Sequence, residues 1–149
     1  MKSLRHKLLI LLIAALITSS CESYLINGNL DGFWQVTSIE NKQIEDTTYC
    51  NGDIYYSFQR ELVLVSYVSP NIPAGQIKEN YIAYFTHDND SIAMTDFRRY
   101  LDSEGTKATQ SALEKFGLYD THNTFLIEKL NSKELIFNSD KARIIFKKY

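Results

Sequence analysis

The chain is poor in cysteine and has no excess of positive charge. Its 149 residues include 2 Cys, at positions 21 and 50, so a framework of several disulfides is excluded. Sixteen Lys and Arg stand against 18 Asp and Glu, and several of the bases lie near the N-terminus. This balance provides no basic face that could neutralise phosphates, so we expect no nucleic-acid partner.

Residue patterns typical of active sites are also scarce. The sequence has no glycine-rich phosphate loop and no nucleophile elbow, and neither His87 nor His122 has the spacing of a metal site. Asp96 precedes Arg98 and Arg99 on a strand-like segment, where adjacent arginines point to opposite faces, so we expect a surface ion pair there. The sequence therefore predicts no enzyme activity, no metal and no cofactor.

One apolar run is present, between basic residues and a cysteine near the N-terminus. Residues 8–17 are uncharged and apolar, and Lys2, Arg5 and Lys7 precede or border them. The run is too short to span a bilayer, which takes roughly 20 apolar residues, and it has the length of a secretory signal peptide. Small residues then lead into Cys21.

This order of residues resembles the lipobox of bacterial lipoproteins, in which the cysteine becomes the mature N-terminus and carries the lipid. The resemblance implies a signal peptide over residues 1–20, lipid attachment at Cys21 and a tether over residues 21–29. The match departs from the usual motif at Thr18, where Leu is usual, and at Ser20, where Ala or Gly is usual. The alternative is a plain signal peptide beside which the cysteine is a bystander.

A lipidated Cys21 has consequences for location and for the second cysteine. It predicts a cell-envelope protein whose first partner is a membrane. Only Glu22 follows the cysteine in place of the acidic run that resembles a surface-export signal, so a periplasm-facing anchor in the outer membrane is favoured. Cys50 then has no intramolecular partner, and no His or Lys beside it would activate the thiol, so partial burial is favoured over a reactive role.

Residues 30–149 have the pattern of one domain built from short strands. Eight segments alternate apolar and polar residues or are rich in Val, Ile and Tyr, and turn residues separate them. Residues 106–116 differ, because Ala108, Ala112 and Phe116 recur at helical spacing and Gly117 suits a helix C-cap. We therefore predict an all-β barrel or sandwich with one short helix. The expected strands are residues 33–39, 54–58, 62–68, 81–86, 92–97, 124–130, 135–137 and 142–148.

The first strand opens with Gly32-Phe33-Trp34, which contains the only Trp of the chain. This resembles the G-x-W signature of lipocalins and related calycin barrels. Together with the lipobox and the strand pattern, it makes the chain similar to small lipocalin-like lipoproteins of Gram-negative gut bacteria. The resemblance implies an antiparallel up-and-down barrel whose base is closed by Trp34, with Arg143 of the last strand packed against it. The helix before the last three strands and the lack of a disulfide depart from the lipocalin pattern.

A barrel of about eight strands is either filled by side chains or holds one small ligand. The 10 Tyr and 8 Phe suit both an aromatic core and an aromatic-lined pocket. If a ligand site exists, we expect it at the open end of the barrel opposite Trp34, lined by Tyr56, Phe58, Tyr67 and Tyr84. Strand parity selects these residues, and Tyr67 joins them if the odd-numbered residues of its strand face inward, which the sequence leaves open because both faces of that strand are apolar. The first hypothesis is thus a lipid-anchored binder of a small apolar or amphipathic ligand. The alternative is a non-enzymatic interaction or structural component with a filled barrel, which contacts another envelope protein.

Overall fold

The computed structural model describes residues 26–69 and 79–149; Cys21 and most of the predicted tether lie outside them. No helix in these described residues is long and apolar enough to cross a membrane. The elements in chain order are η1 (Gly28–Leu30), β1 (Gly32–Asn41), β2 (Asp46–Tyr49), β3 (Ile54–Gln59), β4 (Leu62–Tyr67), β5 (Glu79–His87), β6 (Ser91–Arg99), α2 (Gln110–Leu113), η2 (Glu114–Phe116), β7 (His122–Leu130), β8 (Glu134–Asn138) and β9 (Ala142–Lys148).

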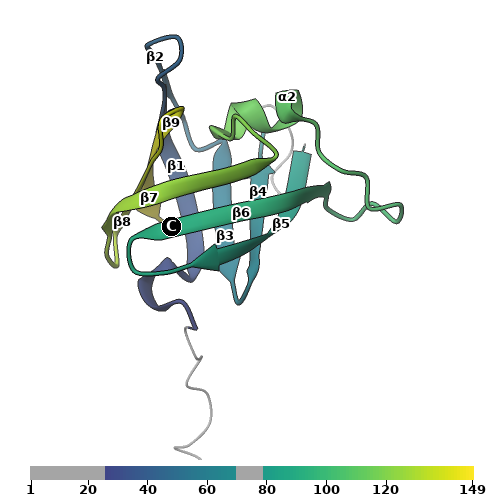
Figure 1. Cartoon of the computed structure of the whole chain (residues 1–149), viewed down its shortest axis with the longest axis horizontal. Coiled ribbons are helices and arrows are strands. Elements are labelled where there is room, and N and C mark those ends of the chain that lie inside the picture. Colours follow the sequence, from purple (N-terminus) through teal and green to yellow (C-terminus); the bar gives the residue numbers. More distant parts are fainter. Residues whose placement is uncertain (1–25, 70–78) are drawn as a thin grey trace, which may run out of the picture.

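The strands form one closed antiparallel barrel (Figure 1). Within the described residues the sheet has nine strands in the order β2-β1-β3-β4-β5-β6-β7-β8-β9, and pairing of β1 with β9 closes it. Eight strands make the barrel, and β2 is an extra strand that pairs with Ser38 to Asn41 at the end of β1. The predicted up-and-down barrel of about eight strands is confirmed. β2 was not expected from the sequence, because all four of its residues are exposed and give no apolar alternation.

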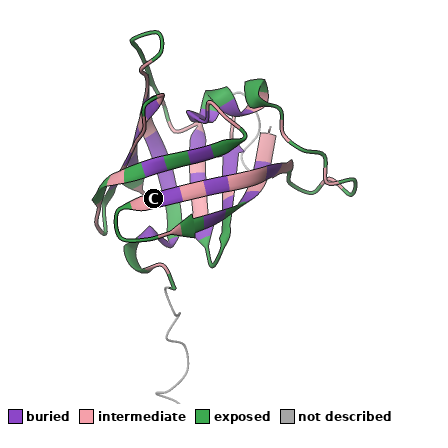
Figure 2. Ribbon diagram, viewed as in Figure 1, coloured by how far each residue is buried: buried purple, intermediate pink, exposed green. Residues whose placement is uncertain are grey.

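Side chains alternate between the two faces of the sheet, as the period of two in a strand requires (Figure 2). On β3, Ile54, Tyr56 and Phe58 are buried inside the barrel, whereas the residues between them are partly exposed outside it. The β-branched and aromatic residues of these strands suit a pleated, half-buried surface. The core is therefore the barrel interior itself.

A short helical segment lies across the end of the barrel opposite η1 (Figure 1). The helix is shorter than predicted: it begins at Gln110 because the Thr109 side-chain oxygen accepts the backbone N–H of Ala112 and caps it. The predicted C-cap is confirmed, since Gly117 is left-handed with φ of 80°. A Cβ at Gly117 would lie 2.8 Å from Ile144 Cδ1, so only glycine fits this approach of the helical segment to β9.

Candidate functional site

The end of the barrel near η1 is closed by Trp34. Its indole is fully buried, and Nε1 donates a hydrogen bond to the Leu30 carbonyl at 2.8 Å. The ammonium of Lys148 lies 4.2 Å from the centre of the Trp34 ring and also donates to the carbonyls of Asn29 and Asp31. Burial lowers the pKa of Lys148. One cation thus joins the end of β9, the indole and the backbone around η1.

The prediction that Arg143 packs on Trp34 is wrong. The guanidinium of Arg143 instead forms a two-point ion pair with Glu128, with N–O distances of 2.8 and 3.0 Å, and it lowers the pKa of that carboxyl. The physical reason is parity. Ala142, Ile144 and Phe146 of β9 face inward, so Arg143 faces outward. Lys148 has the inward parity and is the register partner of Trp34.

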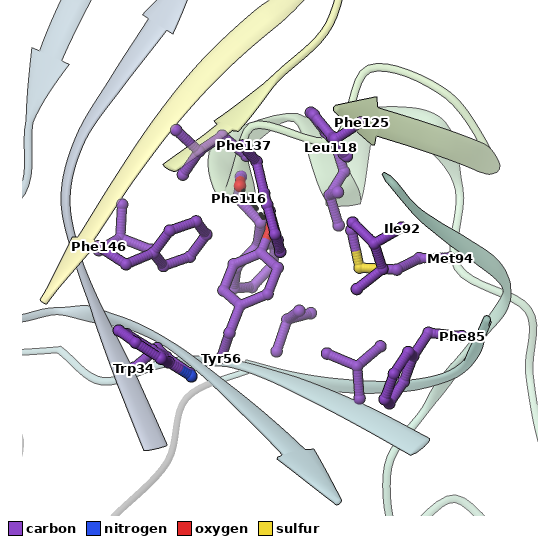
Figure 3. Close-up of a cluster of buried hydrophobic side chains, with 14 of the residues drawn as sticks. Trp34, Tyr56, Phe85, Ile92, Met94, Phe116, Leu118, Phe125, Phe137 and Phe146 are labelled. Carbon is purple, nitrogen blue, oxygen red and sulfur yellow. Dashed lines mark hydrogen bonds between the residues drawn. The ribbon is translucent and has the colours of Figure 1, made fainter. Parts of the chain in front are cut away.

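Aromatic side chains fill the middle of the barrel (Figure 3). Phe58 of β3 meets Phe137 of β8 edge-on, with ring centres 6.1 Å apart, and Phe137 meets Phe146 of β9 at 5.1 Å. Phe58 also contacts Phe85 of β5 at 5.3 Å. This chain of rings crosses the interior from β5 to β9. The other large side chains that are fully buried include Ile92, Met94, Leu113, Phe116, Leu118 and Leu135.

The helical segment acts as a plug of the second barrel end. Leu113, Phe116 and Leu118 are completely buried. The hydroxyl of Tyr56, inside the barrel, donates to the Phe116 carbonyl at 2.7 Å, shown as a dashed line in Figure 3. Burial raises the pKa of the Tyr56 hydroxyl well above its usual value, so the group stays a neutral donor.

The four residues predicted to line a ligand site are not brought together around a hollow. Tyr56 and Phe58 are part of the packed interior. Tyr67 lies at the plugged end, where the Lys115 ammonium of η2 is 5.5 Å from its ring centre. Tyr84 is 55% exposed on the outer face, because Tyr81, Ala83 and Phe85 take the inward positions of β5. The prediction that Tyr84 lines the interior is therefore wrong.

Several hollows in the described part of the chain lie at its surface. Four of them have volumes of about 250 to 550 Å³, and none of these four is lined by Tyr56, Phe58, Tyr67 or Tyr84. The largest, of about 550 Å³, lies on the outer wall of β3, β4 and β5. Its walls are Ser57, Gln59, Arg60, Leu62, Leu64, Ile82 and Tyr100, which combine aliphatic side chains with a few polar groups.

A second hollow, of about 250 Å³, is polar and includes His122. In it, Asp120 pairs with Lys141 at 3.2 Å, and the backbone N–H of Thr121 together with this ammonium lowers the pKa of the carboxyl. Asp120 is thus an ion-pair partner and not a proton acceptor near neutral pH. Among residues 26–69 and 79–149, no three His, Cys, Asp or Glu side chains are grouped as metal ligands.

The ionisable side chains of Asp96 and Cys50 take part in the structure of the barrel. Asp96 accepts two hydrogen bonds from the Arg98 guanidinium at 2.9 and 3.1 Å, as the predicted surface ion pair, and Arg98 also donates to the Gly105 carbonyl. This links the long connection after β6 back to the barrel.

Cys50 is half-buried, and desolvation together with the Asp53 charge raises its pKa to about 11. A thiol with that pKa is a poor nucleophile near neutral pH.

Comparisons with known proteins agree with this geometry. The sequence matches the lipocalin-like domain family over residues 15–149. The chain belongs to the lipocalin-like domain family. Lipocalin-like domains are in general non-enzymatic binding folds. No match is found among curated proteins.

Two solved structures share the lipocalin-like fold. A lipocalin-like protein from Bacteroides uniformis has 17% identity and a TM-score of 0.60, with 82% of this chain and all of that chain covered. An uncharacterized protein from Bacteroides eggerthii has 21% identity and a TM-score of 0.60, with 80% and 99% covered. The predicted similarity to lipocalin-like proteins of gut bacteria is confirmed, and at these identities the likeness concerns the fold.

Proposed function

We propose that this lipocalin-like chain is a lipid-anchored, non-enzymatic component of the cell envelope that acts through its outer surface. The observation that carries the proposal is the filled interior: rings from β3, β5, β8 and β9 contact one another across the barrel. An interior that is packed in this way offers no volume of the 300 Å³ or so that ligand pockets start from. The interaction alternative is therefore favoured over an internal ligand.

The lipocalin-like fold is compatible with small-ligand binding. One observation supports a ligand site on the outside of the barrel as a second candidate function. The 550 Å³ hollow lies outside the barrel, with Leu62, Leu64 and Ile82 among its walls and Arg60 beside them. An amphipathic molecule would meet both aliphatic and polar groups there. A titration with a fluorescent fatty-acid analogue tests it, and Leu64→Asp should abolish binding in this hollow without opening the core.

Envelope attachment rests on the apolar run and Cys21 of the sequence, and we place the anchor in the outer membrane facing the periplasm. Detergent phase partition tests it. The unmodified chain should enter the detergent phase when expressed in a Gram-negative host. Cys21→Ala should shift it to the aqueous phase, whereas the control Cys50→Ala should leave it in detergent. Continued detergent partition of Cys21→Ala would contradict lipid anchoring at this residue.

A further inference from the structure

An apolar strip covers one outer wall of the barrel. Strand register places Tyr149, Phe33, Ser57, Leu64 and Ile82 side by side, from the C-terminus across β1, β3 and β4 to β5. Leu62 and Tyr84 are paired in the neighbouring row. We refer to the surface formed by six of these residues as the apolar wall: Phe33, Leu62, Leu64, Ile82, Tyr84 and Tyr149.

Aromatic rings dominate the part of the apolar wall near β1. Phe33 stacks on Tyr55 with ring centres 5.1 Å apart, and Tyr149 meets both rings edge-on at 5.7 and 5.6 Å. Phe33 is 38% exposed and Tyr149 is 77% exposed, so these rings form a cluster open to the surroundings. Tyrosine has an apolar body and a polar tip, which suits a membrane–water interface.

The charges on this wall are cationic. Lys147, in the row beside Phe33, and Arg60, in the β3–β4 turn, form no ion pair with any other described residue. Between β9 and β5, the row from Lys147 through Gln35 to Tyr55 and the two apolar rows contain no carboxylate. Two carboxylates lie at their edges: Glu61 in the β3–β4 turn, and Glu134 of β8, which is the register partner of Lys147 and forms an ion pair with Lys129. An anionic phospholipid surface attracts such cations.

The proposed lipid anchor keeps this wall close to a bilayer. Cys21 is five residues before Ile26, and five residues span at most about 17 Å when extended. Lys148 hydrogen-bonds the carbonyls of Asn29 and Asp31, so the end of β9 is fixed to the segment where the chain enters the barrel. Tyr149 directly follows Lys148, and Phe33 lies two residues after Asp31. A lipid on Cys21 would therefore hold the apolar wall within reach of the headgroups.

We infer that the apolar wall lies against the phospholipid headgroup region of the membrane in which Cys21 is anchored. The inference rests on the lipid anchoring of the proposed function and adds the contact surface and its partner. A lipid surface fits this wall better than a protein partner because the proposed anchor keeps a membrane beside it. The rows between β9 and β5 also carry tyrosines and Lys147 without a carboxylate, and Arg60 flanks them. The plugged end of the barrel and the β1–β2 hairpin then point away from the membrane.

Quenching of tryptophan fluorescence by brominated acyl chains tests this orientation. The mature lipidated protein is reconstituted in vesicles of phosphatidylethanolamine and phosphatidylglycerol, with and without bromine. Phe33→Trp should lose most of its added emission in brominated vesicles. The matched control is Ile44→Trp, in the β1–β2 hairpin at the other end, where the native residue is 68% exposed; its emission should be unchanged. The native Trp34 is buried and gives a common background.

The outcomes separate the inference from the anchoring proposal. Protein that sediments with vesicles but shows no quenching at Phe33→Trp, or equal quenching at both positions, overturns the inference. Protein that fails to sediment contradicts lipid anchoring instead. An unquenched Phe33→Trp whose emission shifts to the blue only in native envelopes indicates a protein on the wall, and also overturns it. If Phe33→Trp does not fold, Tyr149→Trp tests the same cluster at an exposed terminal residue.

Discussion

Tyr55 and Tyr56 are neighbours on β3 and have opposite environments. Tyr56 is fully buried, and its hydroxyl donates to the plug at the Phe116 carbonyl. Tyr55 lies outside, stacked on Phe33, and its hydroxyl donates to the Gly52 carbonyl at 2.9 Å. The comparison teaches that the same residue type fills the inner face of this barrel and forms a contact surface on its outer face. The first three predictions below each change a residue of the inner face and use a residue of the outer face as the control.

The largest effect is expected at the closed base. Trp34→Ala should cost about 3–5 kcal/mol of unfolding free energy, because it removes a fully buried indole and leaves a cavity. Arg143→Ala removes an outward ion pair and should cost about 1 kcal/mol or less. Urea unfolding followed by circular dichroism measures both. Equal losses in the two variants would contradict the placement of these residues.

The hydroxyl of Tyr56 should matter more than that of Tyr55. Tyr56→Phe leaves the buried Phe116 carbonyl without its donor, which should cost about 1–3 kcal/mol. Tyr55→Phe removes two part-buried hydrogen bonds, one donated to the Gly52 carbonyl and one accepted from Gln35 Nε2, and should cost about 0.5–1.5 kcal/mol. The same urea experiment applies. A harmless Tyr56→Phe substitution would show that the plug is not fixed through this bond.

The two adjacent lysines of β9 should also differ. Lys148→Met removes the ammonium from the face of Trp34, a contact worth about 0.5–2 kcal/mol. Lys147→Met lies on the outer face and should change stability by about 0.5 kcal/mol or less. Thermal unfolding of the pair provides the measurement, and a larger loss in the Lys147 variant would be the contrary result.

The smallest effect concerns Cys50 and appears only at high pH. Its pKa is raised from 9.0 to about 11 in the folded chain, so the folded state keeps the thiol proton over a window in which the unfolded state loses it. That contribution to stability is present below pH 9 and is lost as the pH rises to about 11. Because the thiol is half-exposed, we expect this contribution to the free energy of unfolding to be about 1 kcal/mol or less. In the Cys50→Ser variant, the free energy of unfolding should therefore fall less between pH 9 and 11 than in the unmodified protein. An identical pH dependence of the free energy of unfolding in the two proteins would contradict this prediction.

Much of the fold could be predicted because strand alternation is a local property. The eight barrel strands and the Gly117 cap follow from apolar periodicity and from the left-handed conformation that glycine tolerates. β2 has no buried residue, so no alternation marks it. The start of α2 is set by the Thr109 cap, whereas the sequence pattern extended the helix back through Ala108.

The site was harder to predict because it depends on which face of each strand is inward. Both faces of β5 carry aromatic or aliphatic residues, so Tyr84 could not be placed from its own strand alone. On β9 the parity of Ala142, Ile144 and Phe146 would have excluded Arg143 and selected Lys148. The outer apolar wall depends on register across β1, β3, β4 and β5, which no single segment of the sequence reveals.

Native mass spectrometry of the mature protein, released gently from its membrane, tests the filled barrel most directly. The account predicts only the mass of the polypeptide with its N-terminal lipid, because the rings of Phe58, Phe137 and Phe146 occupy the space an internal ligand would need. A small molecule retained at one copy per chain, and lost on substitution of an inward residue such as Phe58 but not of an outer-wall residue such as Tyr84, would contradict it.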